Sequence, residues 1–218
     1  SWFIYIENGA EFAQRAAVAT LSGIVALSSF CFVYALLCSR FSWKLALFLS
    51  SAVYFVIAIS IGKVGLGVNE STLLAAAVVL LQMYLSPSLE NKPLISPASN
   101  TEIACRMVFA FLLVIAVTGY AGTIGETYSG IFAAYPIAGS TIAIFSHRNY
   151  SSNHAITSLK YMMQGLLSML VFFYVISSYS SQLGFSFAIL LAAIGSLSLQ
   201  AILLYIRQNY NNSLHSAR

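Results

Sequence analysis

Residues 120–161 read YAGTIGETYSGIFAAYPIAGSTIAIFSHRNYSSNHAITSLKY, and this stretch decides the fold. It begins with a glycine-rich turn that carries Glu126 and continues as an apolar run interrupted by Pro136 and Gly139. The run ends in a polar cluster that contains His147 and Arg148. An apolar run between two polar ends predicts a membrane-crossing segment, and Pro136 predicts a kink or a break within it.

The composition of the whole chain agrees with a membrane protein. Of its 218 residues, 59% are hydrophobic and only 7% are charged, and the mean hydropathy is +0.84. A soluble domain carries about 25% charged residues. A chain with so little charge cannot cover its surface in water, so the lipid bilayer is its expected partner. The net charge of +4 therefore indicates orientation in a membrane and not nucleic-acid binding.

Seven apolar runs are long enough, or nearly so, to cross the hydrocarbon core. They cover residues 16–38, 45–61, 70–85, 103–120, 129–145, 158–178 and 185–206. The predicted fold is therefore an all-α polytopic membrane protein with seven transmembrane helices. A proline-containing loop, residues 86–102, separates an N-terminal half (1–85) from a C-terminal half (103–206), and a polar tail (207–218) follows.

The basic residues predict the orientation. Eight of the ten fall on one side of the seven spans: Arg40, Lys44, Lys92, Arg106, Arg148, Lys160, Arg207 and Arg218. Because cytoplasmic loops carry the excess of lysine and arginine, the Ser1 end is expected outside and the Arg218 end in the cytoplasm. The expected location is a bacterial inner membrane.

An internal repeat is the second organising feature. A shift of 142 positions aligns residues 1–58 with residues 143–200 and pairs Gly23 with Gly165 and Ala46 with Ala188. An odd number of spans separates the two copies, so they would be inverted, as in many secondary transporters. A true repeat predicts that two further helices precede Ser1. The alternative is a chance match between two apolar compositions, with Ser1 near the natural start.

Few polar residues are placed to act on a solute or a proton. Glu126 is either a carboxylate at the mouth of a cavity or a solvated residue of an external turn. His147 and Arg148 either bind an anion or relay protons, or they simply stabilise the end of a helix. Glu70 lies close to a span, where an ionisable group is a functional candidate by default.

The remaining candidates belong to the other copy of the repeat. Glu7 and Arg15 lie in the polar approach to the first span and are the expected counterparts of the cluster at residues 146–158. With Pro136 they complete the predicted set of substrate- or ion-binding residues.

Enzymatic chemistry is not expected. The six acidic residues are all glutamates, so no Ser-His-Asp triad can be drawn. The three cysteines show no spacing typical of a metal site, and no nucleotide-binding fingerprint occurs. We therefore expect no catalytic residues, no metal and no cofactor.

Two stretches carry a resemblance to a known family. They are the opening FIYIENGAEFAQR (3–15) and the pattern Ser129-Gly130, Pro136, Ser146-His147-Arg148, Gly165-Leu166. Together they resemble the AciT-like family of small bacterial inner-membrane proteins. The resemblance implies a polytopic protein linked to the passage of small molecules or antibiotics across the envelope, with no catalytic residues to transfer.

The favoured prediction is an inner-membrane transporter of a small solute, proton-linked, that works by alternating access between inverted halves. The alternative is a non-transporting scaffold or envelope-maintenance protein whose polar residues serve packing and partner binding. The sequence leaves open whether the protein is a homo-oligomer.

Overall fold

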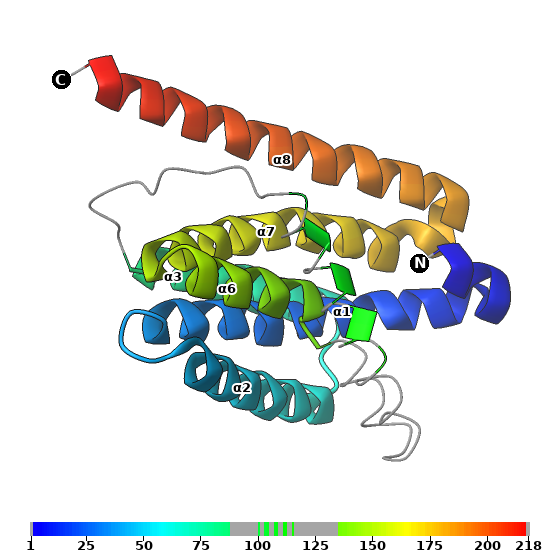
Figure 1. The fold of residues 1–218 in the computed structure, drawn as a ribbon. Coiled ribbons are helices and arrows are strands. Elements are labelled where there is room, and N and C mark those ends of the chain that lie inside the picture. Colours follow the sequence, from blue (N-terminus) through cyan, green and yellow to red (C-terminus); the bar gives the residue numbers. More distant parts are fainter. Residues whose placement is uncertain are drawn as a thin grey trace.

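The computed structural model describes residues 2–87, 100, 103–104, 107–108, 111–112, 115 and 135–216, and within these ranges it describes side chains from residue 18 to residue 209. The elements of the described residues are all helices: α1 (Trp2–Leu37), α2 (Trp43–Val64), α3 (Val68–Leu85), α6 (Ile137–Asn149), α7 (Ser152–Leu183) and α8 (Phe185–Ser216). The predicted all-α class is confirmed for this part of the chain (Figure 1).

Five of these helices are long and apolar enough to cross a membrane. Their apolar spans are Val18–Leu37, Trp43–Val64, Val68–Leu85, Ser152–Leu183 and Phe185–Asn209. They correspond to five of the seven predicted spans, which are confirmed. Helix α8 continues to Ser216, into the stretch predicted as the polar tail.

The prediction of seven spans is not supported at the other two positions. The span predicted at 103–120 lies mostly outside the described residues. The span predicted at 129–145 appears as α6, which has only 13 residues and begins directly after Pro136. At 1.5 Å per residue α6 is about 20 Å long, too short to cross a core of about 30 Å alone.

Helix ends follow from local sequence. Gly65 ends α2 with a positive φ of 64°, and Gly184 joins α7 to α8 with a φ of 76°, a region that favours glycine. Lys63 lies in the last turn of α2, where a cation suits the helix dipole. Ser151 caps α7, and its hydroxyl accepts the N–H of His154 at 3.1 Å.

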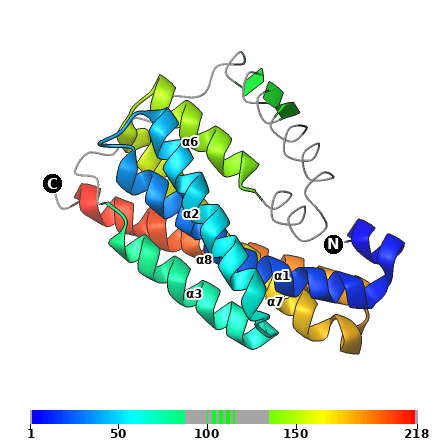
Figure 2. The same ribbon diagram turned by 90° about the horizontal axis from the view of Figure 1, so that it is seen from below.

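Helix α1 is the centre of the bundle, because α2, α3 and α7 all pack on it (Figure 2). One cluster joins α1 to α2, α6 and α7 around Phe30, Tyr34 and Leu159. A second joins α1, α3 and α7 around Ile24, Val79 and Leu166. The N-terminal and C-terminal halves therefore share one core. Helix α8 is peripheral and packs mainly on α7.

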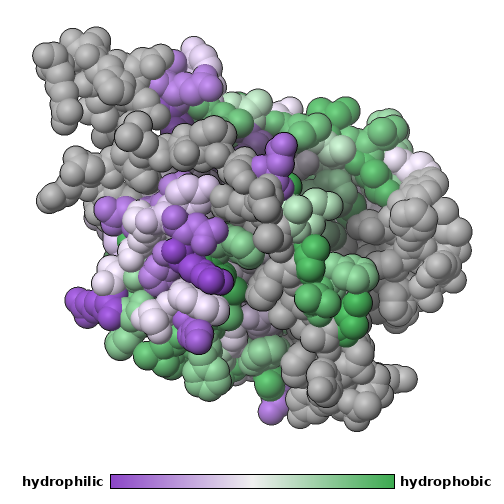
Figure 3. All heavy atoms as spheres, in the orientation of Figure 1, coloured by the Kyte–Doolittle hydropathy of each residue, from purple (hydrophilic) through white to green (hydrophobic). Residues whose placement is uncertain are grey.

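The charged residues gather at one end of the bundle. Five of the six lysine and arginine residues with described side chains lie where α1 ends, α2 begins and the α6–α7 turn falls, or at the matching level of α8: Arg40, Lys44, Arg148, Lys160 and Arg207. Figure 3 shows hydrophilic side chains gathered on one side of the visible face and hydrophobic ones toward the other. We call the end of the bundle that carries these five residues the basic end.

Candidate functional site

Helix α6 carries several polar residues into the bundle interior. Pro136 precedes the first residue of α6. Proline is favoured at a helix start because it has no N–H to donate to a carbonyl of a preceding turn. The buried face of α6 lies mainly against α7 and, apart from Ile144, consists of small and hydroxyl residues: Gly139, Ser140, Thr141, Ala143 and Ser146. Small side chains on this face let the two helices approach closely.

A hydroxyl cluster lies at the start of α6. The hydroxyls of Tyr135 and Ser51 are 2.6 Å apart and join α6 to the middle of α2. Ser140, which is fully buried, also lies within reach of the Tyr135 hydroxyl. Aromatic rings surround the pair, with Phe55 stacked at 5.7 Å and Tyr54 edge-on at 5.6 Å from Tyr135. The cluster therefore places neutral donors and acceptors among apolar side chains.

At the other end of α6, His147 meets helix α1. Its Nδ1 lies 3.4 Å from the hydroxyl of Tyr34, and the two rings are edge-on with centroids 6.0 Å apart. Partial burial lowers the pKa of His147, so the neutral imidazole is favoured at neutral pH. In the tautomer that leaves Nδ1 unprotonated, the Tyr34 hydroxyl donates to it.

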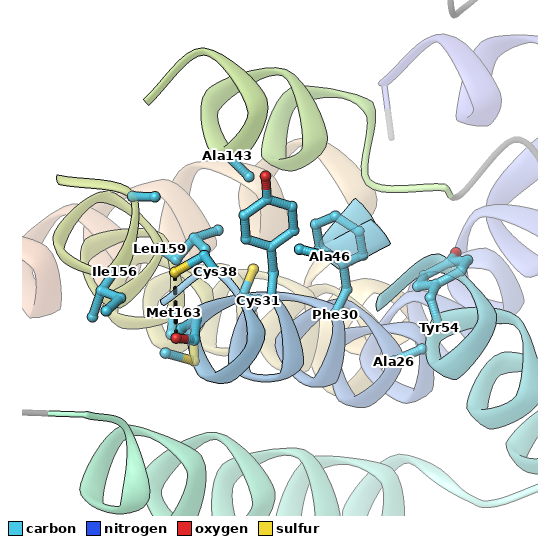
Figure 4. Packing of buried hydrophobic residues seen from close by; sticks show 13 residues of the cluster. Ala26, Phe30, Cys31, Cys38, Ala46, Tyr54, Ala143, Ile156, Leu159 and Met163 are labelled. Carbon is cyan, nitrogen blue, oxygen red and sulfur yellow. Dashed lines mark hydrogen bonds between the residues drawn. The ribbon is translucent and has the colours of Figure 1, made fainter. Parts of the chain in front are cut away.

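Two hydrogen bonds hold the turn between α6 and α7 against the end of α1, and we call this pair of contacts the clamp. The Ser152 hydroxyl donates to the carbonyl oxygen of Cys38 at 2.7 Å, and the Cys38 thiol donates weakly to the carbonyl oxygen of Ser152 at 3.7 Å. Burial raises the pKa of Cys38 to about 11, so this cysteine remains a protonated thiol. Figure 4 shows Cys38 beside Ile156, Leu159 and Met163 of α7.

Four residues of the predicted set have described side chains, and they do not gather in one place. Pro136 and His147 lie at the two ends of α6, while Arg148 is exposed at the basic end. Glu70 is exposed and accepts the N–H of Gly67 at 3.0 Å, which caps α3. Its carboxylate therefore has a structural role at the helix start.

The other predicted residues cannot be placed in the site. Glu126 lies outside the described residues. Glu7 and Arg15 belong to the helical backbone of α1, but their side chains are among those that the structure does not describe.

Sequence reasoning missed the partners of the predicted residues. Tyr34 and Ser51 lie inside apolar runs of the sequence. Only their hydroxyl groups could have marked them as site residues, and serine and tyrosine occur too often in these runs for that to single them out. Tyr135 could have been found, because it directly precedes Pro136. The described residues contain no group of three His, Cys, Asp or Glu side chains that could hold a metal ion.

No family model, no curated protein and no solved structure matches the chain. Its function must therefore be argued from its own geometry.

Proposed function

We propose that the protein is a membrane transporter of a small polar solute, and that its hairpins α1–α2 and α7–α8 are the two copies of an inverted repeat. The observation that carries this proposal is a correspondence of buried positions under the 142-residue shift. Helix α2 begins at Trp43 and α8 begins at Phe185, which is the same position in the two copies.

The buried face of α7 corresponds to part of the buried face of α1. Six buried residues of α7 have a described counterpart in α1, and all six counterparts are buried. The pairs are Leu21 and Met163, Ile24 and Leu166, Ser28 and Leu170, Tyr34 and Ile176, Ala35 and Ser177, and Cys38 and Ser180. The reverse comparison is incomplete, because the counterparts of the buried residues Phe30 and Cys31 are only half-buried in α7. The shift therefore aligns the two packing faces in part.

The outer helices of the hairpins correspond in the same way. Ala46 and its counterpart Ala188 are both fully buried. On the opposite faces, Phe48 and its counterpart Leu190 are 69% and 62% exposed, so both copies turn equivalent apolar side chains toward lipid. Two diverged copies would share such a division between core and lipid faces, because it is set by the helix period.

An inverted repeat would relate the two hairpins by a two-fold axis. Equivalent residues meet at the axis of a two-fold interface. Ile24 and its counterpart Leu166 belong to one buried cluster, and Cys38, directly after the end of α1, contacts Ser152 at the start of α7. Helices α1 and α7 are therefore antiparallel and cross near the equivalent pair.

The hydroxyl cluster at the start of α6 is the proposed solute site. In transporters built from inverted repeats, the solute binds near the midplane beside discontinuous helices. Helix α6 extends about 20 Å inward from the basic end, which brings Tyr135 and Ser51 to about the middle of a core of about 30 Å. Their neutral hydroxyls suit a small polar solute.

The remaining parts of the proposal concern location and coupling. The basic end is the cytoplasmic side of a bacterial inner membrane, by the excess of lysine and arginine there. The Ser1 end is then outside. Protons would be carried by His147 on the cytoplasmic side and Glu126 on the outer side.

A non-transporting scaffold is the second candidate. It is favoured by the dense packing of Phe30, Tyr34 and Tyr54, each at most 2% exposed, between the two hairpins. Aromatic side chains that fill this space would have to move before a solute could pass.

Cysteine accessibility separates the two candidates without a known solute. Ser51→Cys in a protein that lacks the three native cysteines is treated with a membrane-impermeant thiol reagent on either side of a vesicle. Transport predicts labelling from both sides, since alternating access exposes the midplane to each in turn. Ser60→Cys on the lipid side of α2 is the control and should not react. No labelling of Ser51→Cys from either side would refute transport.

A further inference from the structure

The hairpin of α7 and α8 carries a polar pair far from its turn. Tyr161 and Arg207 lie 23 residues before and after Gly184 (positions 161, 184 and 207), and the guanidinium carbon of Arg207 lies 3.7 Å from the centre of the Tyr161 ring. This cation–π contact holds the guanidinium group over the ring.

The distance from the turn places this pair at the membrane surface. A helix rises 1.5 Å per residue, so 23 residues span about 35 Å. The hydrocarbon core is about 30 Å thick. When Gly184 lies at one surface, Tyr161 and Arg207 therefore lie among the lipid headgroups of the other. Tyrosine is enriched at this depth.

The charge at this site has no partner within the described residues. Lys160 precedes Tyr161, and both Lys160 and Arg207 are half-buried. The one glutamate with a described side chain, Glu70, caps α3 at the opposite end of the bundle. Two neighbouring half-buried cations favour a nearby negative charge, so this pair is a candidate for binding an anion.

We propose that the basic end of the α7–α8 hairpin binds the phosphate group of an anionic phospholipid. The guanidinium of Arg207 binds two phosphate oxygens, Tyr161 holds it in place, and Lys160 supplies the second charge. The acyl chains lie along the exposed apolar face of α8, where Leu197 and Ile202 are 70% and 55% exposed. This site is separate from the hydroxyl cluster and does not depend on transport.

Other cations at the same end offer a matched control. Arg40 has the same charge and lies at the same end, but it is exposed and no aromatic contact holds it among the described residues. A general attraction of the basic end for anionic lipid would depend equally on Arg40 and Arg207. A defined site would depend on Arg207, because of the two only its guanidinium is held over an aromatic ring.

Lipid retention tests the site directly. Purified protein is incubated with equal amounts of phosphatidylglycerol and phosphatidylcholine, and the lipids that remain bound are counted by native mass spectrometry. We expect wild type to favour phosphatidylglycerol, Arg207→Gln to reduce this preference about five-fold, and Arg40→Gln to leave it unchanged. Tyr161→Leu should weaken it without changing the charge, which gives a second test if Arg207→Gln does not fold.

Three results would overturn the proposal. The first is an unchanged preference in both Arg207→Gln and Tyr161→Leu. The second is an equal loss in Arg40→Gln, which would indicate diffuse attraction. The third is complete displacement of the lipid by excess inorganic phosphate, because the site would then recognise a free phosphate group and not a lipid.

Discussion

The Tyr34 hydroxyl of helix α1 lies 3.4 Å from Nδ1 of His147 in the last turn of α6. The two residues are 113 positions apart in the sequence. This contact and the one between Ser51 and Tyr135 hold α6 against the bundle at its two ends. Between them α6 presents small side chains to α7. The short helix is thus held at both ends by polar contacts between residues far apart in the sequence.

Acidification should weaken the native state through His147. Partial burial lowers the pKa of His147 in the folded protein, so folding favours the neutral ring. Its stabilising contribution is complete above the unfolded pKa of about 6.5 and falls as pH drops below that value. Thermal unfolding in detergent should show a fall in Tm of a few degrees from pH 8 to pH 5, and His147→Gln should show a smaller fall. Equal falls in both proteins would contradict this role.

The Ser51 and Tyr135 hydroxyls should be energetically coupled. Hydrogen bonds between membrane helices contribute about 0.6 kcal/mol on average and up to about 1.7 kcal/mol. A double-mutant cycle with Ser51→Ala and Tyr135→Phe, followed by unfolding in mixed micelles, should give a coupling within this range. Ser60→Ala is the control, because the Ser60 hydroxyl donates only to Val56 of its own helix at 2.7 Å. Strictly additive effects of Ser51→Ala and Tyr135→Phe would disprove the contact.

These contacts show why the fold was easier to predict than the site. The five confirmed spans follow from hydrophobic length alone, which local sequence reports directly. Pro136 likewise marked the start of α6, because its effect on the backbone is local. The partners Tyr34 and His147 meet only when α1 and α6 pack, and no local pattern records a contact between residues 113 positions apart.

The close approach of α6 to α7 at Gly139 should tolerate little added volume. A Cβ at Gly139 would lie 2.6 Å from Cε of Met162, which is the flexible end of that side chain. Gly139→Ala should therefore cost little, since Met162 can move. Gly139→Leu should destabilise by about 1–3 kcal/mol, the usual cost of overpacking. Thermal unfolding measures both.

A compensating change separates overpacking from other effects of Gly139→Leu. Adding Met162→Ala removes the side chain in the way and should recover part of the lost stability. Gly165→Leu is a matched control on α7, because a Cβ there meets no atom within 4 Å. If Gly165→Leu destabilises as much as Gly139→Leu, the cost does not come from the α6–α7 contact.

The thiol of Cys38 should react slowly with alkylating reagents. Burial raises its pKa to about 11, compared with 9.0 for a free cysteine side chain, and the thiolate is the reactive form. At pH 8 the thiolate population, and with it the labelling rate, should be about 100-fold lower than for an unperturbed thiol. The rate is measured in a protein that retains Cys38 as its only cysteine, with the same protein denatured in detergent as the reference.

Ser152→Ala should accelerate labelling, because it removes the 2.7 Å hydrogen bond from the Ser152 hydroxyl to the Cys38 carbonyl oxygen and loosens the turn that covers the thiol. Equal native and denatured rates would show that the end of α1 is open, and the clamp between α1 and the α6–α7 turn would then be wrong.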